Sequence, residues 1–193
     1  MKNIAVFVSG GGTDMQSVID AVKSGKINGR VALVVSNKHG VYALERAKNE
    51  GIESEVFTVN DYGSIIKRDE AILNKLLDKK IDLVVLAGYL SIVSPVIIDK
   101  YRDRIINIHP SLIPKYCGMG FYGLKVHEAV INGKETESGC TVHYVDEGAD
   151  TGKIIKQVKV PVLEGDTPET LQERVLKQEH ILLPEIVAKL CEE

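Results

Sequence analysis

The residues best suited to chemistry are an amide and an imidazole two positions apart, Asn107 and His109. They follow a short apolar stretch that is typical of a buried strand. Side chains alternate faces along a strand, so Asn107 and His109 should point to one side while Ile106 and Ile108 pack on the other. Pro110 cannot continue a strand ladder and keeps His109 out of helical geometry. The pair is therefore expected at the rim of a sheet, at the carboxyl end of a strand.

Open α/β sheets bind ligands outside the carboxyl ends of their strands. An amide donor and an imidazole there could stabilise an oxyanion and move a proton, as acyl transfer requires. Asp150, in the acidic loop 146–152, is the candidate third member, because a carboxylate that reached His109 would raise the pKa of the imidazole. The spacing alone also fits a turn histidine and a solvated aspartate, so a purely structural role stays open.

A glycine-rich loop, Ser9-Gly10-Gly11-Gly12-Thr13, directly follows the apolar run 4–8. Glycines let backbone amides approach a ligand, and a helix that starts there directs its positive end at the same place, which suits a phosphate. The third glycine of a dinucleotide fingerprint would fall on Met15, and no Gly-Lys-Ser/Thr follows, so both the dinucleotide fingerprint and the P-loop are excluded. A tight turn without a ligand is the remaining alternative.

The first half of the chain alternates strand and helix patterns. We expect strands at 4–8, 31–35, 54–58 and 83–87 and helices at 14–23, 42–49 and about 62–77. This alternation predicts an α/β fold with a doubly wound, mostly parallel, Rossmann-like sheet and helices on both faces. The second half predicts an antiparallel extension, with strands at 140–145 and 153–160, a helix at 126–131 and a last helix from Thr167-Pro168 that Pro184 should kink near His180.

Length and composition indicate one domain, residues 1–193, with the phosphate loop in residues 1–100 and the catalytic residues in 101–193. The chain is 44% hydrophobic and 26% charged with a net charge of −3, and it has no basic stripe, so we expect no nucleic-acid partner. Its longest apolar window is too short to cross a membrane. Three unpaired cysteines favour a cytoplasmic location, the histidine spacing predicts no metal site, and a monomer or a homodimer is expected.

Five segments together make the pattern specific: residues 9–13, 86–95, 107–116, 143–150 and 178–180. They resemble the folate-dependent formyltransferases from end to end. The glycine loop and the Gln178-Glu179-His180 segment narrow the resemblance to the phosphoribosylglycinamide formyltransferases of purine biosynthesis. The resemblance implies transfer of a formyl group from 10-formyltetrahydrofolate to the amine of the ribonucleotide through a tetrahedral intermediate, without a metal.

The resemblance also implies roles for individual residues. Asn107 would stabilise the oxyanion, His109 would donate the proton, and Asp150 would hold His109 and raise its pKa. Phosphate and glycinamide binding would fall to Gly11, Gly12, Thr13, Asp14 and Glu179. The folate would be bound by Leu90, Ser91, Ile92, Val93, Asn107, Asp146, Glu147, Gly148, Ala149 and Asp150.

The chain departs from the family pattern at several positions. Asp14 stands where an asparagine is usual, and we expect its side chain to turn away from the phosphate toward a local donor. Ile65 stands near a usual arginine for the folate's glutamate tail, with Lys67 and Arg68 the nearest basic candidates. Ser91 also replaces a common arginine.

Other functions remain open at this stage. The same block could transfer the formyl group to another amine, as on methionyl-tRNA, or hydrolyse formyltetrahydrofolate. Those enzymes carry additional domains, which we do not expect here. A non-catalytic phosphate-binding module would use only the glycine loop. A cysteine hydrolase at Cys117, in the loop 117–122 that is longer than in the shortest relatives, is the weakest alternative because nothing marks a thiolate.

Overall fold

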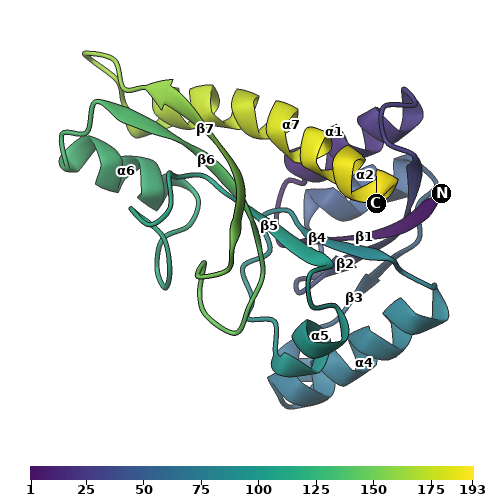
Figure 1. The fold of residues 1–193 in the computed structure, drawn as a ribbon. Helices are drawn as coiled ribbons and strands as arrows, with labels where there is room; N and C mark the ends of the chain where they lie inside the picture. The colour runs from purple at the N-terminus through teal and green to yellow at the C-terminus, as the bar shows by residue number, and fades with distance from the viewer.

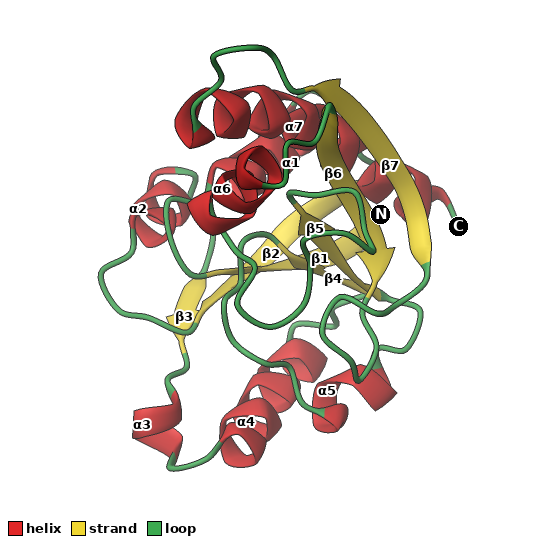
Figure 2. Cartoon of the chain, turned by 90° about the vertical axis from the view of Figure 1, so that its left-hand side faces the viewer, coloured by secondary structure: helices red, strands yellow, loops and turns green.

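The computed structural model describes all 193 residues and has one seven-stranded sheet with helices on both faces (Figures 1 and 2). The strands are β1 (Lys2–Val8), β2 (Gly29–Ser36), β3 (Ser54–Val56), β4 (Leu83–Leu86), β5 (Ile105–His109), β6 (Glu137–Tyr144) and β7 (Ile154–Pro161). Their order in the sheet is β3-β2-β1-β4-β5-β6-β7. β1 to β5 are parallel, while β6 and β7 are antiparallel. The predicted fold class is confirmed.

The helices are α1 (Thr13–Lys23), α2 (Tyr42–Asn49), α3 (Val59–Tyr62), α4 (Ile65–Asp78), α5 (Pro95–Lys100), α6 (Leu124–Asn132) and α7 (Pro168–Glu192). Period-two alternation on β1 divides them into two layers. Ile4, Val6 and Val8 pack with residues of α1, α2 and α7, whereas Ala5 and Phe7 pack with residues of α4 and α5. A strand covered on both faces is apolar throughout, as β1 is from Ile4 to Val8.

Three differences from the sequence prediction are larger than a shift of an element's ends by a few residues. The helix expected at 62–77 is two helices, because Gly63 ends α3 in the left-handed conformation (φ 80°) and Ser64 caps α4 through the Lys67 amide. β3 is shorter than predicted and ends at Val56. The six-residue α5 was not predicted, since it is too short for a periodic pattern. α7 begins with the expected Thr167 cap and runs on through Pro184.

The sheet topology gathers three loops at one place. β1 is paired with β2 on one side and with β4 on the other, so the direction of winding changes between β1 and β4. Ligands bind at such switch points, beyond the carboxyl ends of the strands. The glycine loop follows β1, the segment 87–94 follows β4, and His109 ends β5 beside them.

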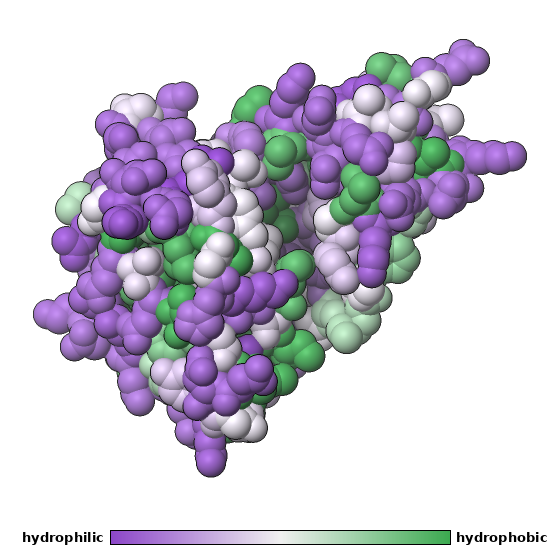
Figure 3. All heavy atoms as spheres, turned by 180° about the vertical axis from the view of Figure 1, so that it is seen from behind, coloured by the Kyte–Doolittle hydropathy of each residue, from purple (hydrophilic) through white to green (hydrophobic).

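β6, β7 and α6 extend beyond the parallel part of the sheet (Figure 1). Seen from behind, the surface is hollowed between this extension and the body, with apolar side chains along the hollow (Figure 3). No helix is both long and apolar enough to cross a membrane. Cys117, Cys140 and Cys191 are all free.

Candidate active site

The end of β5 and the neighbouring strand β6 position the central side chains. β5 ends at His109, directly before Pro110. In the antiparallel register, Asn107 lies opposite His143 and His109 lies opposite Thr141. Asn107 and His109 therefore share one face of the sheet, as the sequence predicts.

The loop that follows β6 presents Asp150. Asp146 organises this loop, because its carboxylate accepts hydrogen bonds from the Gly148 amide (3.1 Å) and from the Thr151 hydroxyl (2.6 Å). Asp150 itself has a left-handed backbone (φ 58°), a conformation that aspartate tolerates better than most residues. A side chain at Gly152 would collide with the Tyr144 carbonyl, so glycine is required where the loop returns to β7.

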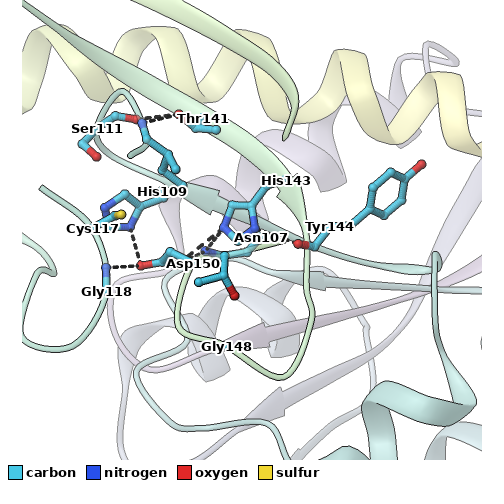
Figure 4. Close-up of polar contacts among 12 residues, drawn as sticks. Asn107, His109, Ser111, Cys117, Gly118, Thr141, His143, Tyr144, Gly148 and Asp150 are labelled. Atoms are coloured by element: carbon cyan, nitrogen blue, oxygen red, sulfur yellow. Dashed lines mark hydrogen bonds and ion pairs between the residues drawn. The ribbon is translucent and has the colours of Figure 1, made fainter. Parts of the chain in front are cut away.

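The Asp150 carboxylate lies at the centre of the polar cluster shown in Figure 4. Its Oδ2 atom is 3.6 Å from His109 Nδ1 and accepts a 2.9 Å hydrogen bond from the Gly118 amide. Its Oδ1 atom is 3.5 Å from His143 Nε2 and 3.4 Å from Asn107 Nδ2. The predicted set of Asn107, His109 and Asp150 is thus brought together, and His143 joins it.

Carbonyl contacts fix which nitrogen of each imidazole carries a proton. His109 Nε2 lies 2.9 Å from the Tyr116 carbonyl oxygen, and His143 Nδ1 lies 2.8 Å from the Tyr144 carbonyl oxygen. A carbonyl only accepts hydrogen bonds, so both of these nitrogens must be N–H donors. The nitrogen of His109 left to gain or lose a proton is Nδ1, which faces Asp150.

The cluster is largely buried, and burial dominates its electrostatics. Burial lowers the pKa of His109 below its ordinary value. The Tyr116 carbonyl and the Asp150 charge both favour the charged ring and so act in the opposite direction, but their combined effect is smaller. The expected effect of the Asp150 charge is therefore present, but burial outweighs it. For Asp150, burial acts to raise the pKa, but the contacts with His143, His109 and the Gly118 amide prevail and lower it.

The glycine loop leaves the start of α1 open to a ligand. Gly12 is the N-cap residue with φ 74°, and no side chain caps the helix. A Cβ atom at Gly12 would lie 2.6 Å from the Ala43 Cβ atom, so the loop can approach α2 only as glycine. Arg46 anchors the loop by donating from Nε to the Gly11 carbonyl (2.8 Å). The first amides of α1 thus remain available, in a geometry that suits an anion.

Asp14 and Glu179 meet in the interface between α1 and α7. The Asp14 Oδ1 atom is buried without a hydrogen bond, and its nearest cationic candidate is His180 Nε2 at 3.6 Å. Burial raises the pKa of Asp14 to about 7 and raises that of Glu179 well above its ordinary value. The Asp14 side chain lies in this helix interface, and the expected hydrogen bond from a local donor is wrong, because Oδ1 has no hydrogen-bond partner.

The other expected folate residues lie in two loops beside the cluster. Leu90 and Ile92 are exposed apolar side chains on the segment after β4. The Leu90 amide donates to Ser9 Oγ at 2.8 Å, which ties this segment to the start of the glycine loop. In the loop 146–150, Glu147 points outward and pairs with Arg102 at 2.5 Å.

Sequence reasoning missed the role of His143 and assigned a wrong role to Arg68. His143 sits in register with Asn107, and alternation along β6 was the signal that could have found it. Arg68 was expected as a basic candidate for the glutamate tail, but its side chain is fully buried and its guanidinium contacts Ser91 and Ile92. It therefore cannot face a solvent-exposed tail.

Comparison with known proteins places these observations in a family. Residues 2–187 match the family model described as formyl transferase. The phosphoribosylglycinamide formyltransferase of Haemophilus influenzae is 40% identical over 187 residues, covering 97% of this chain and 86% of that protein. The trifunctional purine biosynthetic protein adenosine-3 of Drosophila pseudoobscura pseudoobscura is 44% identical over 192 residues, but this chain spans only 14% of its length.

The fold agrees with the sequence match. The crystal structure of glycinamide ribonucleotide transformylase 1 from Symbiobacterium toebii superposes with a TM-score of 0.94 at 40% identity, covering 100% of this chain and 88% of that one. The chain belongs to the formyl transferase family.

Proposed function

We propose that this protein transfers a formyl group from 10-formyltetrahydrofolate to the amine of 5′-phosphoribosylglycinamide in purine biosynthesis, and that it does so in the cytoplasm. The observation that carries the proposal is the convergence of Asn107, His109 and Asp150 beside the open start of α1. One site supplies an amide donor, a titratable imidazole and a carboxylate, and the neighbouring loop suits a phosphate.

Asn107 is the candidate oxyanion donor. One of its two amide hydrogens is committed to His143 Nε2 at 3.1 Å, while the other makes only the long 3.4 Å contact with Asp150. The second hydrogen is available to the formyl oxygen as negative charge develops on that oxygen. Stabilising a developing oxyanion with a fixed donor is the largest single contribution in many acyl transfers.

His109 and Asp150 are the candidates for moving the proton. The substrate amine attacks the formyl carbon and forms a C–N bond, and the tetrahedral intermediate then collapses by breaking the bond from carbon to N10 of the folate. The amine loses a proton and N10 gains one. His109 Nδ1, supported by the Asp150 carboxylate 3.6 Å away, can pass that proton without any covalent enzyme intermediate.

Substrate binding divides between two regions. The amides of Gly11, Gly12, Thr13 and Asp14 receive the phosphate, and Glu179 binds the glycinamide end. The folate lies between the segment Leu90–Val93 and the loop Asp146–Asp150, with its formyl group at the Asn107 amide.

The test is turnover of 10-formyltetrahydrofolate with 5′-phosphoribosylglycinamide, followed by mass spectrometry of the formylated product. Glycinamide without the phosphoribosyl group serves as the control acceptor, and we expect it to react at least a hundredfold less efficiently because the phosphate contacts are lost. Formate released at the same rate without any acceptor would instead identify a hydrolase. Formylation of methionyl-tRNA alone would identify a different transferase.

The cysteine hydrolase alternative loses its chemical basis. Burial and the nearby Asp150 charge raise the pKa of the Cys117 thiol, so a reactive thiolate is disfavoured.

A further inference from the structure

The segment after β4 has almost no backbone hydrogen bonds to hold its shape. Residues 88–93 take part in none of the backbone hydrogen bonds that stabilise turns and loops. Free amide and carbonyl groups are what a ligand can bind, but only if they point in fixed directions. Apart from the bond between the Leu90 amide and Ser9, the polar contacts that hold this segment all come from α4.

A buried ion pair on α4 supplies those contacts. Arg68 is 0% exposed, and its Nε atom donates to Asp69 Oδ1 at 2.8 Å. The two terminal nitrogens of its guanidinium donate to the Ser91 hydroxyl (2.5 Å) and to the Ile92 carbonyl (2.6 Å). Asp69 Oδ2 accepts from the Ser94 amide at 2.6 Å. One pair therefore fixes Ser91 and Ile92 within the segment and Ser94 directly after it.

Stability alone gives a weak reason for such a pair. Removing two charges from water is costly, and well-packed apolar residues in place of a buried ion pair often stabilise a protein equally well. The donors of Arg68 are instead directed at a hydroxyl and a carbonyl of a loop. A planar guanidinium can hold three acceptors in a fixed fan, which a lysine ammonium on a flexible stem does less well.

We infer that Arg68 is a positioning residue for donor binding: with Asp69 it orients the backbone of Leu90–Val93 that receives the folate ring. Arg68 acts through the segment and not by touching the folate. The inference rests on the proposed function, because it assigns this segment to the folate.

The test compares a double variant, Arg68→Met/Asp69→Asn, with the unsubstituted chain. The double variant leaves no unpaired buried charge, and an amide oxygen at position 69 can still accept from Ser94. Arg30→Met, the same change at an exposed arginine at the amino end of β2, is the matched control. The readouts are thermal unfolding, the Kd for tetrahydrofolate carrying one or several glutamates, and kcat with the KM for phosphoribosylglycinamide.

We expect the Kd for monoglutamyl tetrahydrofolate to rise at least tenfold in the double variant, with kcat at saturating donor within threefold and the acceptor KM within twofold. The ratio of polyglutamyl to monoglutamyl affinity should not change. Ser91→Ala, which removes one contact, should raise the Kd about threefold. An unchanged Kd in the folded double variant, or a loss confined to polyglutamyl folate, would overturn the inference.

If the double variant does not fold, the Ser91→Ala variant is the test. An unchanged Kd of that variant for monoglutamyl tetrahydrofolate then overturns the inference. Failure of the proposed function looks different, because the unsubstituted chain would show no turnover with phosphoribosylglycinamide.

Discussion

Asn107 and His143 lie opposite each other on β5 and β6, with Asn107 Nδ2 3.1 Å from His143 Nε2. The Tyr144 carbonyl accepts a hydrogen bond from His143 Nδ1, so Nε2 is an acceptor whenever the ring is neutral. An acceptor at that place requires the nitrogen end of the Asn107 amide to face it. His143 therefore selects which end of Asn107 is presented to Asp150 and to the reacting group.

Replacing His143 with leucine should lower kcat about tenfold with little change in either KM, because Asn107 stays in place but its amide can rotate. Steady-state kinetics with both substrates measure this, with His39→Leu, an exposed histidine, as the control. A rise in the folate KM at unchanged kcat would contradict the orienting role.

Replacing His109 with alanine should lower kcat by roughly two to four orders of magnitude, the usual worth of general acid–base catalysis. Because burial lowers the pKa of His109, the acid limb of the kcat/KM profile should lie at a lower pH than for an ordinary imidazole. The profile of the unsubstituted enzyme tests this sign directly. Full activity in the alanine variant would remove His109 from the mechanism.

Replacing Asn107 with leucine should cost on the order of a hundredfold in kcat, comparable to losing one oxyanion donor. The Kd for tetrahydrofolate should change less than kcat does, since leucine keeps the approximate size of the side chain. Binding by fluorescence and single-turnover rates separate the two effects. A loss seen only in binding would make Asn107 a recognition residue.

Replacing Asp150 with asparagine should lower the pKa of His109 further, because a charge that favours the imidazolium is withdrawn. An NMR titration of the imidazole protons measures the midpoint in the free enzyme. The Gly118 amide can still donate to the asparagine oxygen, so the loop should keep its place. An identical midpoint in both proteins would show that the 3.6 Å separation carries no interaction.

Local patterns were sufficient for the fold class and for two residues of the site. Alternation along β5 predicted that Asn107 and His109 share a face, and Pro110 predicted where the strand ends. The approach of Asp150 depends on the left-handed backbone at that residue and on Asp146 within its loop, so no spacing in the sequence could establish the contact. Only the family resemblance predicted that Asn107, His109 and Asp150 belong to one site.

The residues whose roles were predicted wrongly or missed are those whose positions depend on contacts between segments distant in the sequence. Arg68 lies on a helix whose spacing indicated one buried face, and its basic character suggested solvent. In the structure Asp69, Ser91 and Ile92 satisfy it in the interior. A charged residue at a core position is thus explained by acceptors that come from a distant loop, which periodicity does not record.

The buried Asp14 carboxyl should make the free energy of unfolding depend on pH. Burial in the interface with α7 raises its pKa from 3.8 to about 7, beside the Glu179 carboxyl and His180 on α7 and near the Cys140 thiol on β6. A group with a raised pKa binds its proton more tightly in the folded chain. Its contribution to the free energy of unfolding is therefore present at low pH and is lost as the pH rises from the ordinary pKa of 3.8 through the raised pKa of about 7.

Asp14→Asn should remove this dependence, so relative to the variant the unsubstituted chain should lose about 2 kcal/mol of stability between pH 5 and pH 8. Urea unfolding at both pH values measures the difference, with Asp20→Asn, an exposed acid on the same helix, as the control. Because the Asp14 carboxyl points into the helix interface, phosphoribosylglycinamide affinity should change less than tenfold. A hundredfold tightening, about 2.7 kcal/mol, would instead place the carboxylate against the phosphate and would refute this placement of its side chain.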